Sequence, residues 1–258
     1  MSTYLTRFAE IICATNDTAI RSDVTLGGQL VIEQSGNLTI SYAPFEHIQR
    51  GARIVIVGIT PGAQQAANAL SEVRRRLIAG DNHLSALAAA KVFASFSGGM
   101  RTNLVEMLDH IGVARWLGIS SADKLWTTHS ALAHFTSALR YPVFFGSENF
   151  NGQVNMARSP SLVRLLNECL AEEAAALPDA VWVPAGPKAE AGVQFLVEKG
   201  LLRSDRVLSG FLHPSTASNE RVHYFVGKKA REKLSPKTNP VTIDAARKSL
   251  MAKVAGLP

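Results

Sequence analysis

The hydrophobic residues of this chain fall into strand-like and helix-like runs that alternate from residue 53 onward. Residues 53–57 (RIVIV) form a nearly continuous β-branched run, which is typical of a strand covered on both faces. After Pro61 and Gly62 the apolar positions take helical spacing, at Ala66, Leu70, Val73 and Leu77, and the pattern stops at Gly80. The pattern therefore predicts repeated units of strand, glycine-containing turn and helix.

The same reasoning assigns the rest of the chain to short elements. Strands are predicted at 30–32 and 38–42, paired as a hairpin around 35–37, and at 125–127, 141–145, 180–184 and 206–212. Helices are predicted at 4–14, 103–110, 130–139, 161–176, 189–198 and 242–254, and another follows residue 218. This alternation predicts an α/β fold, a three-layer α/β/α sandwich around a central, mainly parallel four-stranded sheet. We expect one domain over 1–258, with an N-terminal helix and hairpin (1–50) and a C-terminal helical tail (235–258).

Composition narrows the class of protein. The chain has 258 residues, of which 47% are hydrophobic, so it can bury a substantial core. Its two cysteines, Cys13 and Cys169, are too few for a disulfide framework, an iron–sulfur cluster or a structural zinc site. No apolar run reaches the roughly 20 residues that span a bilayer, and no signal-peptide pattern is seen. We expect a cytoplasmic protein without a membrane partner.

The excess of basic residues is modest, and the place where these residues cluster says more about a polyanionic partner than their number does. The chain carries 27 Lys and Arg residues against 21 Asp and Glu residues, and its pI is near 9.5. Several cations follow residue 218 closely, namely Lys228, Lys229, Arg231 and Lys233. They form either a solvated helix face or a surface for a polyanion.

Two corners between a strand and a helix carry the candidate chemistry. The first is residues 58–62 (GITPG), and the second is residues 212–215 (LHPS). Thr60 and His213 each follow a strand, and ligands of parallel sheets bind outside the carboxyl ends of the strands. Glycine and helix amino termini in such corners favour anions. An imidazole held beside proline can donate a hydrogen bond to a developing oxyanion.

Together these segments resemble motif A and motif B of the uracil-DNA glycosylase superfamily. Motif A corresponds to residues 58–62, and motif B to residues 212–215 with 216–219 following. Residues 96–99 (FSGG) are similar to the family's phenylalanine–x–glycine element, and residues 181–189 resemble its third strand and glycine corner. The resemblance covers about residues 50–234 and is most specific in motif B.

The resemblance implies hydrolysis of an N-glycosidic bond in DNA without a metal or organic cofactor. Phe96 would stack on a base that is flipped out of the helix. His213 would stabilise negative charge on the pyrimidine, and the corner at Gly58, Ile59, Thr60, Pro61 and Gly62 would hold the attacking water. The residues expected to contact nucleic acid are Lys188, Pro214, Ser215, Thr216, Ser218, Asn219, Arg221, Lys228 and Lys229.

Two departures from the family pattern leave catalysis and specificity open. Thr60 stands where strongly active members carry Asp or Asn, and its hydroxyl cannot act as a carboxylate base. The asparagine that reads the base is absent from residues 125–128. Its role is open among Thr128, His129, Asn149 and Asn151, and the acidic alternatives for activating water are Glu148 and Asp109.

Three functions remain consistent with this sequence. The first is a base-excision glycosylase that acts on uracil or a related damaged base. The second is a DNA-binding or damaged-base-binding protein in which Thr60 has ended the chemistry. The third is an enzyme that acts on a small nucleoside or nucleotide.

Overall fold

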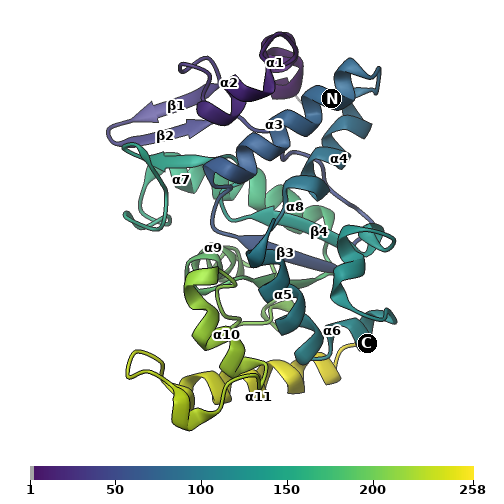
Figure 1. The fold of residues 1–258 in the computed structure, drawn as a ribbon, viewed down its shortest axis with the longest axis vertical. Coiled ribbons are helices and arrows are strands. Elements are labelled where there is room, and N and C mark those ends of the chain that lie inside the picture. Colours follow the sequence, from purple (N-terminus) through teal and green to yellow (C-terminus); the bar gives the residue numbers. More distant parts are fainter. Residues whose placement is uncertain (1–2) are drawn as a thin grey trace.

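The fold is a mixed α/β arrangement built on a parallel sheet of three strands. The structure is a computed structural model and describes residues 3–258. The central strand β3 (Ile54–Gly58) pairs with β4 (Ala133–Ser137) on one side and with β7 (Val181–Pro184) on the other. The predicted strands 53–57 and 180–184 are thereby confirmed. Figure 1 shows this sheet between helices α1–α4 at one end of the molecule and α10 and α11 at the other.

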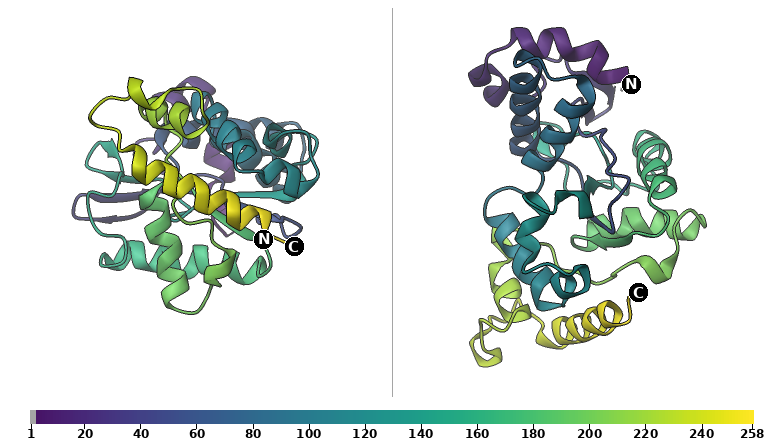
Figure 2. Two further views of the ribbon diagram at one scale, coloured as in Figure 1. Left: turned by 90° about the horizontal axis from the view of Figure 1, so that it is seen from below. Right: turned by 90° about the vertical axis from the view of Figure 1, so that its right-hand side faces the viewer.

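Helices cover both faces of the parallel sheet because β3 is apolar on both sides. Val55 and Val57 belong to one hydrophobic core, and Ile54 and Ile56 to the other. The first core includes α1 (Thr3–Ala14), α2 (Asp17–Ser22), α3 (Ala63–Ile78), α4 (His83–Ala94), α7 (Pro160–Leu165), α8 (Ala171–Ala176) and α9 (Pro187–Glu198). The second includes α5 (Gly99–His110), α6 (Val113–Leu117), α10 (Asn219–Phe225) and α11 (Pro240–Ala255). The last of these lies across the lower end of the molecule (Figure 2).

A second, antiparallel sheet incorporates the predicted N-terminal hairpin. Strands β1 (Val31–Ser35) and β2 (Leu38–Ser41) pair with each other as the sequence predicts. β2 also pairs with β5 (Val143–Phe145), which continues into the short β6 (Glu148–Asn149). The hairpin formed by β5 and β6 is therefore anchored to the N-terminal region through β2.

The predicted fourth parallel strand contributes only one bridge in the described residues. Val207 forms an isolated parallel bridge with Trp182 of β7, and Leu208 N–H donates to the Trp182 carbonyl at 2.8 Å. Gly210 then turns the chain with a φ of 86°, and its N–H donates to the carboxylate of Glu190. Because a residue in this conformation cannot continue an extended ladder, the regular sheet stops at three strands.

The predictions for residues 125–139 are wrong. Residues 122–126 form a 3₁₀ turn, and the strand is residues 133–137, which were predicted to be helical. The carboxylate of Asp109 accepts hydrogen bonds from the Ser121 hydroxyl and the Ala122 N–H, which starts the turn. Pairing with β3 in parallel register overrides the helical pattern of 133–137, as tertiary context often does.

Two helices differ in detail from their prediction. The predicted helix 161–176 contains a π-helical segment at Leu166–Leu170 between α7 and α8. The helix after residue 218 ends at Phe225, so the cations from Lys228 to Lys233 lie in a turn and a 3₁₀ segment (Arg231–Lys233). The remaining short 3₁₀ segments are Ser130–Leu132, Ser204–Arg206 and Thr216–Ser218.

Candidate functional site

A cavity of about 920 Å³ opens at the carboxyl edge of the parallel sheet. Its lining includes Gly58 at the end of β3, Ser137 at the end of β4 and Ala185 just after β7. Open parallel sheets bind ligands at this edge. The predicted site residues that line the cavity are Gly58, Ile59, Thr60, Gly62, Phe96, Asn149, Asn151, Lys188, His213, Ser215 and Arg221. Both candidate corners therefore border one cavity.

The Thr60 hydroxyl ties two segments of backbone together. It donates to the Tyr141 carbonyl at 2.9 Å and accepts from the Val143 N–H at 3.0 Å. The hydroxyl thus links the corner after β3 to the start of β5, and its only proton is already used. This role is structural, and local spacing could not indicate it because it depends on two residues more than 80 positions away.

His213 is held against the glycine corner after β7. Gly186 has a φ of 95°, and a Cβ built on it would lie 2.8 Å from the His213 Cβ. The Gly186 N–H donates to the Phe211 carbonyl at 3.1 Å, which brings the two turns together. Burial lowers the pKa of His213, so its imidazole is neutral at neutral pH and can donate one hydrogen bond.

Phe96 borders the cavity in a rarely populated backbone conformation. Its φ is 48° and its side chain is buried. The Arg101 guanidinium donates to the Phe96 carbonyl at 3.1 Å, and the Trp126 indole N–H donates to the Ser95 carbonyl at 2.9 Å. A Cβ on Gly58 would lie 3.6 Å from the Phe96 ring and 3.3 Å from the Ser137 hydroxyl. These contacts fix an aromatic edge beside the end of β3.

Asn103 braces the turn at residues 212–219 through hydrogen bonds. Asn103 was not predicted to be a site residue from the sequence. Its buried side-chain amide donates to the Pro214 carbonyl at 3.0 Å and to the Asn219 side chain at 2.7 Å. It also lies 3.4 Å from the Ser215 carbonyl. Asn103 is on α5, so one helix braces the turn that follows His213. The sequence shows only that Asn103 lies near the start of a predicted helix, and an asparagine there is expected to cap its own helix rather than to bond a distant turn.

The β5–β6 hairpin supplies a polar wall with one carboxylate. The Asn149 side chain accepts from the Ala63 N–H at 2.9 Å, at the amino end of α3. Asn151 also lines the cavity. Glu148 is the only Asp or Glu side chain in the lining among residues 3–258. Asp109, the other acidic alternative, is instead bound to Ser121 and Ala122.

Two of the cations that are expected to contact nucleic acid line the cavity. Lys188 and Arg221 line it. Lys228 is paired with Glu106 and Lys229 with Glu220, and neither lines the cavity. Both lysines lie after the end of α10 at Phe225, so the expected basic helix is a turn in which two of the cations are paired with acids.

Several predicted residues lie outside the cavity lining. Thr128 and His129 are exposed in the loop before β4, at its amino end, whereas the cavity lies at the carboxyl end. They hydrogen-bond to each other at 2.9 Å. Thr128 and His129 were expected at the cavity because the strand was predicted at 125–127 rather than at 133–137. Of the four candidates for reading the base, only Asn149 and Asn151 line the cavity. Residues that belong to the corners without lining the cavity are Pro61, Pro214, Thr216, Ser218 and Asn219.

Across residues 3–258, no group of three or more His, Cys, Asp or Glu side chains is placed to hold a metal ion. In the same range, no helix has the length and apolar character that crossing a membrane requires.

The fold and the cavity first define a class, a mixed α/β protein with a candidate ligand site at the carboxyl edge of a parallel sheet. Comparison then shows the family. The chain is 34% identical over 224 residues to YoxB, an uncharacterized protein of Bacillus subtilis strain 168, covering 86% of this chain and 87% of YoxB. The chain therefore belongs to the YoxB family. No protein-family model matches it, and no solved structure matches it significantly.

Proposed function

We propose that this protein is a DNA base-excision glycosylase with a uracil-DNA glycosylase-like fold. The observation that carries the proposal is that Thr60, Phe96 and His213 line one cavity, although 36 and 117 positions separate them in turn along the chain. An aromatic edge, a neutral imidazole and a strand corner on one cavity suit a flipped pyrimidine. DNA is the proposed partner, and the reaction needs no metal or organic cofactor.

In this proposal His213 stabilises the leaving base. As the N-glycosidic bond breaks, negative charge grows on a pyrimidine oxygen, and a neutral imidazole N–H can donate to it. Because Asn103 and Gly186 hold the turn and the imidazole from two sides, the donor is already oriented before substrate binds. Phe96 would contact the face of the base.

Glu148 is the proposed activator of water. The Thr60 hydroxyl donates its proton to Tyr141, so it cannot donate to a water while that bond is kept. Glu148 is the carboxylate of the described lining, and its exposed side chain can reach solvent. A carboxylate near an attacking water contributes about 10²–10⁴-fold by general base catalysis.

The base edge would be read by short polar groups. The Ser137 hydroxyl lies beside Gly58 at the end of β4, and Asn151 lies on the hairpin wall. Asn149 uses its side-chain oxygen on Ala63, which leaves its amide N–H groups available. Lys188, Arg221 and Ser215 would contact the phosphates beside the flipped nucleotide.

A strand-cleavage assay tests this function. Single- and double-stranded oligonucleotides with one uracil, or one other deaminated or oxidised base, are incubated with the protein and treated with alkali. We expect an abasic product from at least one substrate and a loss of about 100-fold with His213→Ala, the size typical of a lost oxyanion donor. No product with any substrate at high protein excess would contradict the proposal.

The Glu148→Gln variant separates water activation from binding. It should lower the single-turnover rate by about 100-fold while the affinity for DNA stays within about twofold. Glu198→Gln changes an exposed carboxylate at the end of α9, outside the cavity, and should leave the rate unchanged. A normal rate with Glu148→Gln would show that Glu148 does not activate the water, and the proposal of glycosylase activity would still stand.

A second function, DNA or damaged-base binding without cleavage, is favoured by one observation. The hydroxyl at the motif A position is bound to backbone on both sides. If that position has ended the chemistry, the protein should bind oligonucleotides in a salt-dependent manner without cleaving them. Thr60→Asn should then create or raise excision. Stabilisation by nucleotides but not by oligonucleotides would instead indicate a small-molecule enzyme.

A further inference from the structure

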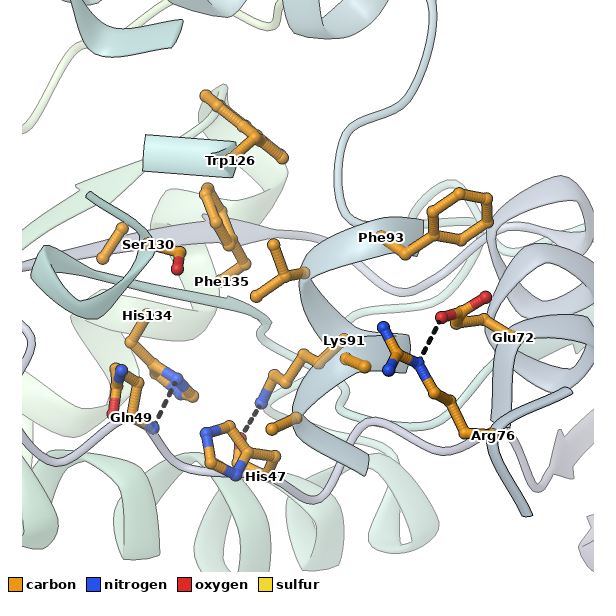
Figure 3. Close-up of a pocket in the computed structure, with 14 residues that line it drawn as sticks. His47, Gln49, Glu72, Arg76, Lys91, Phe93, Trp126, Ser130, His134 and Phe135 are labelled. Carbon is orange, nitrogen blue, oxygen red and sulfur yellow. Dashed lines mark hydrogen bonds and ion pairs between the residues drawn. The ribbon is translucent and has the colours of Figure 1, made fainter. Parts of the chain in front are cut away.

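A second cavity, of about 420 Å³, lies beside β4 and shares no lining residue with the first. β4 is an edge strand of the parallel sheet, and α3, α4 and the segment around 47–49 complete the walls (Figure 3). Its volume is within the range of small-molecule sites. Nothing in the proposed glycosylase chemistry uses it.

A buried primary amine borders this cavity. Lys91 is only 2% exposed, and its Nζ donates to the His47 carbonyl at 2.7 Å. The same atom lies 3.5 Å from the Glu173 carboxylate. Figure 3 shows Lys91 and His134 converging from α4 and β4 above His47. An ammonium has three N–H donors, so two partners leave one donor for a ligand.

The charge of Lys91 is only partly balanced. Glu173 is completely buried and lies closer to Arg140, at 3.0 Å, than to Lys91. Burial lowers the pKa of Lys91 to about 8, although the Glu173 carboxylate opposes this shift. The titratable groups around the amine are Glu46, His47, His134, Arg140 and Glu173. A desolvated lysine of this kind has a substantial neutral, nucleophilic fraction near neutral pH.

The wall near Lys91 is flat and apolar. The rings of Trp126 and Phe135 stack with centroids 4.5 Å apart. Both rings are buried, the Arg101 guanidinium lies 5.1 Å from the Trp126 ring centroid, and the Trp126 indole N–H is bound to the Ser95 carbonyl. This wall is therefore apolar and offers no free indole donor. Ala88 and Val92 of α4 complete the apolar lining. A lining that is partly apolar and aromatic is typical of small-molecule sites and favours an apolar ligand.

We propose that this second cavity binds a small apolar aldehyde or ketone and that Lys91 condenses with its carbonyl group. The Nζ lone pair forms a bond to the carbonyl carbon while the C=O π electrons move to oxygen. Transfer of a proton from nitrogen to that oxygen gives a carbinolamine. Loss of the hydroxyl group with a second nitrogen proton releases water and leaves an imine. Amine and carbonyl thus become imine and water without oxidation or reduction.

Reductive trapping on the full chain tests this site. The protein is incubated with benzaldehyde and sodium cyanoborohydride between pH 6 and 10, and labelled lysines are mapped by peptide mass spectrometry. At pH 7.5 Lys91 should hold on the order of 100-fold more neutral amine than an ordinary exposed lysine, so it should label first, with a midpoint near pH 8. Labelling confined to exposed lysines, or labelling of Lys91 only after urea unfolding, would overturn the proposal.

Three variants on α4 show whether the cavity directs the reaction and whether Lys91 carries the label. Ala88 precedes Lys91 by three positions on the same helix face, so Ala88→Phe should fill the cavity and reduce Lys91 labelling at least tenfold. Leu84→Ala changes a residue that is 67% exposed and outside the lining, and it should leave labelling unchanged. Lys91→Arg keeps the charge and should abolish the label on that peptide. Equal Lys91 labelling in the unchanged protein, Ala88→Phe and Leu84→Ala would refute a directed site.

Discussion

At the scale of single residues, the first cavity depends on close approaches that leave no spare volume. Gly186 shows this most directly, because its missing Cβ is the space that His213 occupies. Thr60 and Asn103 act in a similar way, each holding two or more distant backbone groups with one short side chain. Motif residues identify this region in the sequence, but these contacts set its geometry.

We predict that Gly186→Ala is much more harmful than Gly80→Ala. Both glycines have a φ above 90°, so both variants carry the cost of a left-handed alanine, about 1–2 kcal/mol. Only Gly186 also places the new Cβ 2.8 Å from His213, whereas nothing lies within 4 Å of the Cβ at Gly80. Urea unfolding should show a further loss of about 1–3 kcal/mol for Gly186→Ala. Equal losses would mean that the turn relaxes freely away from His213.

At the scale of elements, the hydrophobic pattern correctly predicted strands and helices that adjoin a clear turn. It failed for a segment whose conformation depends on pairing with a distant strand. The pattern predicted β3, β7 and α9 because each carries its own apolar run and its own turn. It failed for β4, whose five residues include His134 and Thr136 and extend only because β3 pairs with them. The same error moved the expected base-reading residues to the wrong edge of the sheet.

The C-terminal helix α11 gives a prediction at this scale. Leu250 is completely buried in the second core, and its neighbour Met251 is 44% exposed. Leu250→Ala should lower the free energy of unfolding by about 2–5 kcal/mol, because it leaves a cavity in the core that α11 shares with α6 and α10. Met251→Ala should change it by less than about 0.5 kcal/mol. If thermal or urea unfolding showed an equally small loss of stability for Leu250→Ala and Met251→Ala, α11 would not be a necessary part of the core.

At the scale of the whole molecule, a buried ionic cluster couples the helical layer to the edge of the sheet. Glu173 of α8 meets Arg140, His134 of β4 and Lys91 of α4. Burial alone would raise the pKa of Glu173, but the charges of Lys91 and Arg140 outweigh it and hold the pKa well below its ordinary value. Burial and the charge of Lys91 lower the pKa of His134 to about 4. Such a cluster makes stability depend on pH.

We predict that the folded state loses stability as the pH falls from 6.5 towards 4. In this window the unfolded chain protonates His134 and the folded chain does not, so acid favours unfolding. This residue alone should account for about 3 kcal/mol by pH 4. Urea unfolding at several pH values should show a shallower slope for His134→Gln than for the unchanged protein. His129→Gln, which alters an exposed imidazole, should keep the full slope, and an unchanged slope in His134→Gln would contradict the assignment.

The sequence by itself determined the α/β class, most strands and helices, and the two corners, because each of these is written in local spacing of apolar residues, glycine and proline. Only the tertiary structure decided which partners those residues meet. It reduced the fourth strand to a bridge, committed the Thr60 hydroxyl to backbone, paired Lys228 and Lys229 with acids, and put Glu148 at the cavity. Hydrogen bonds, ion pairs and cavities join residues that are far apart in the chain, and local spacing carries no information about them.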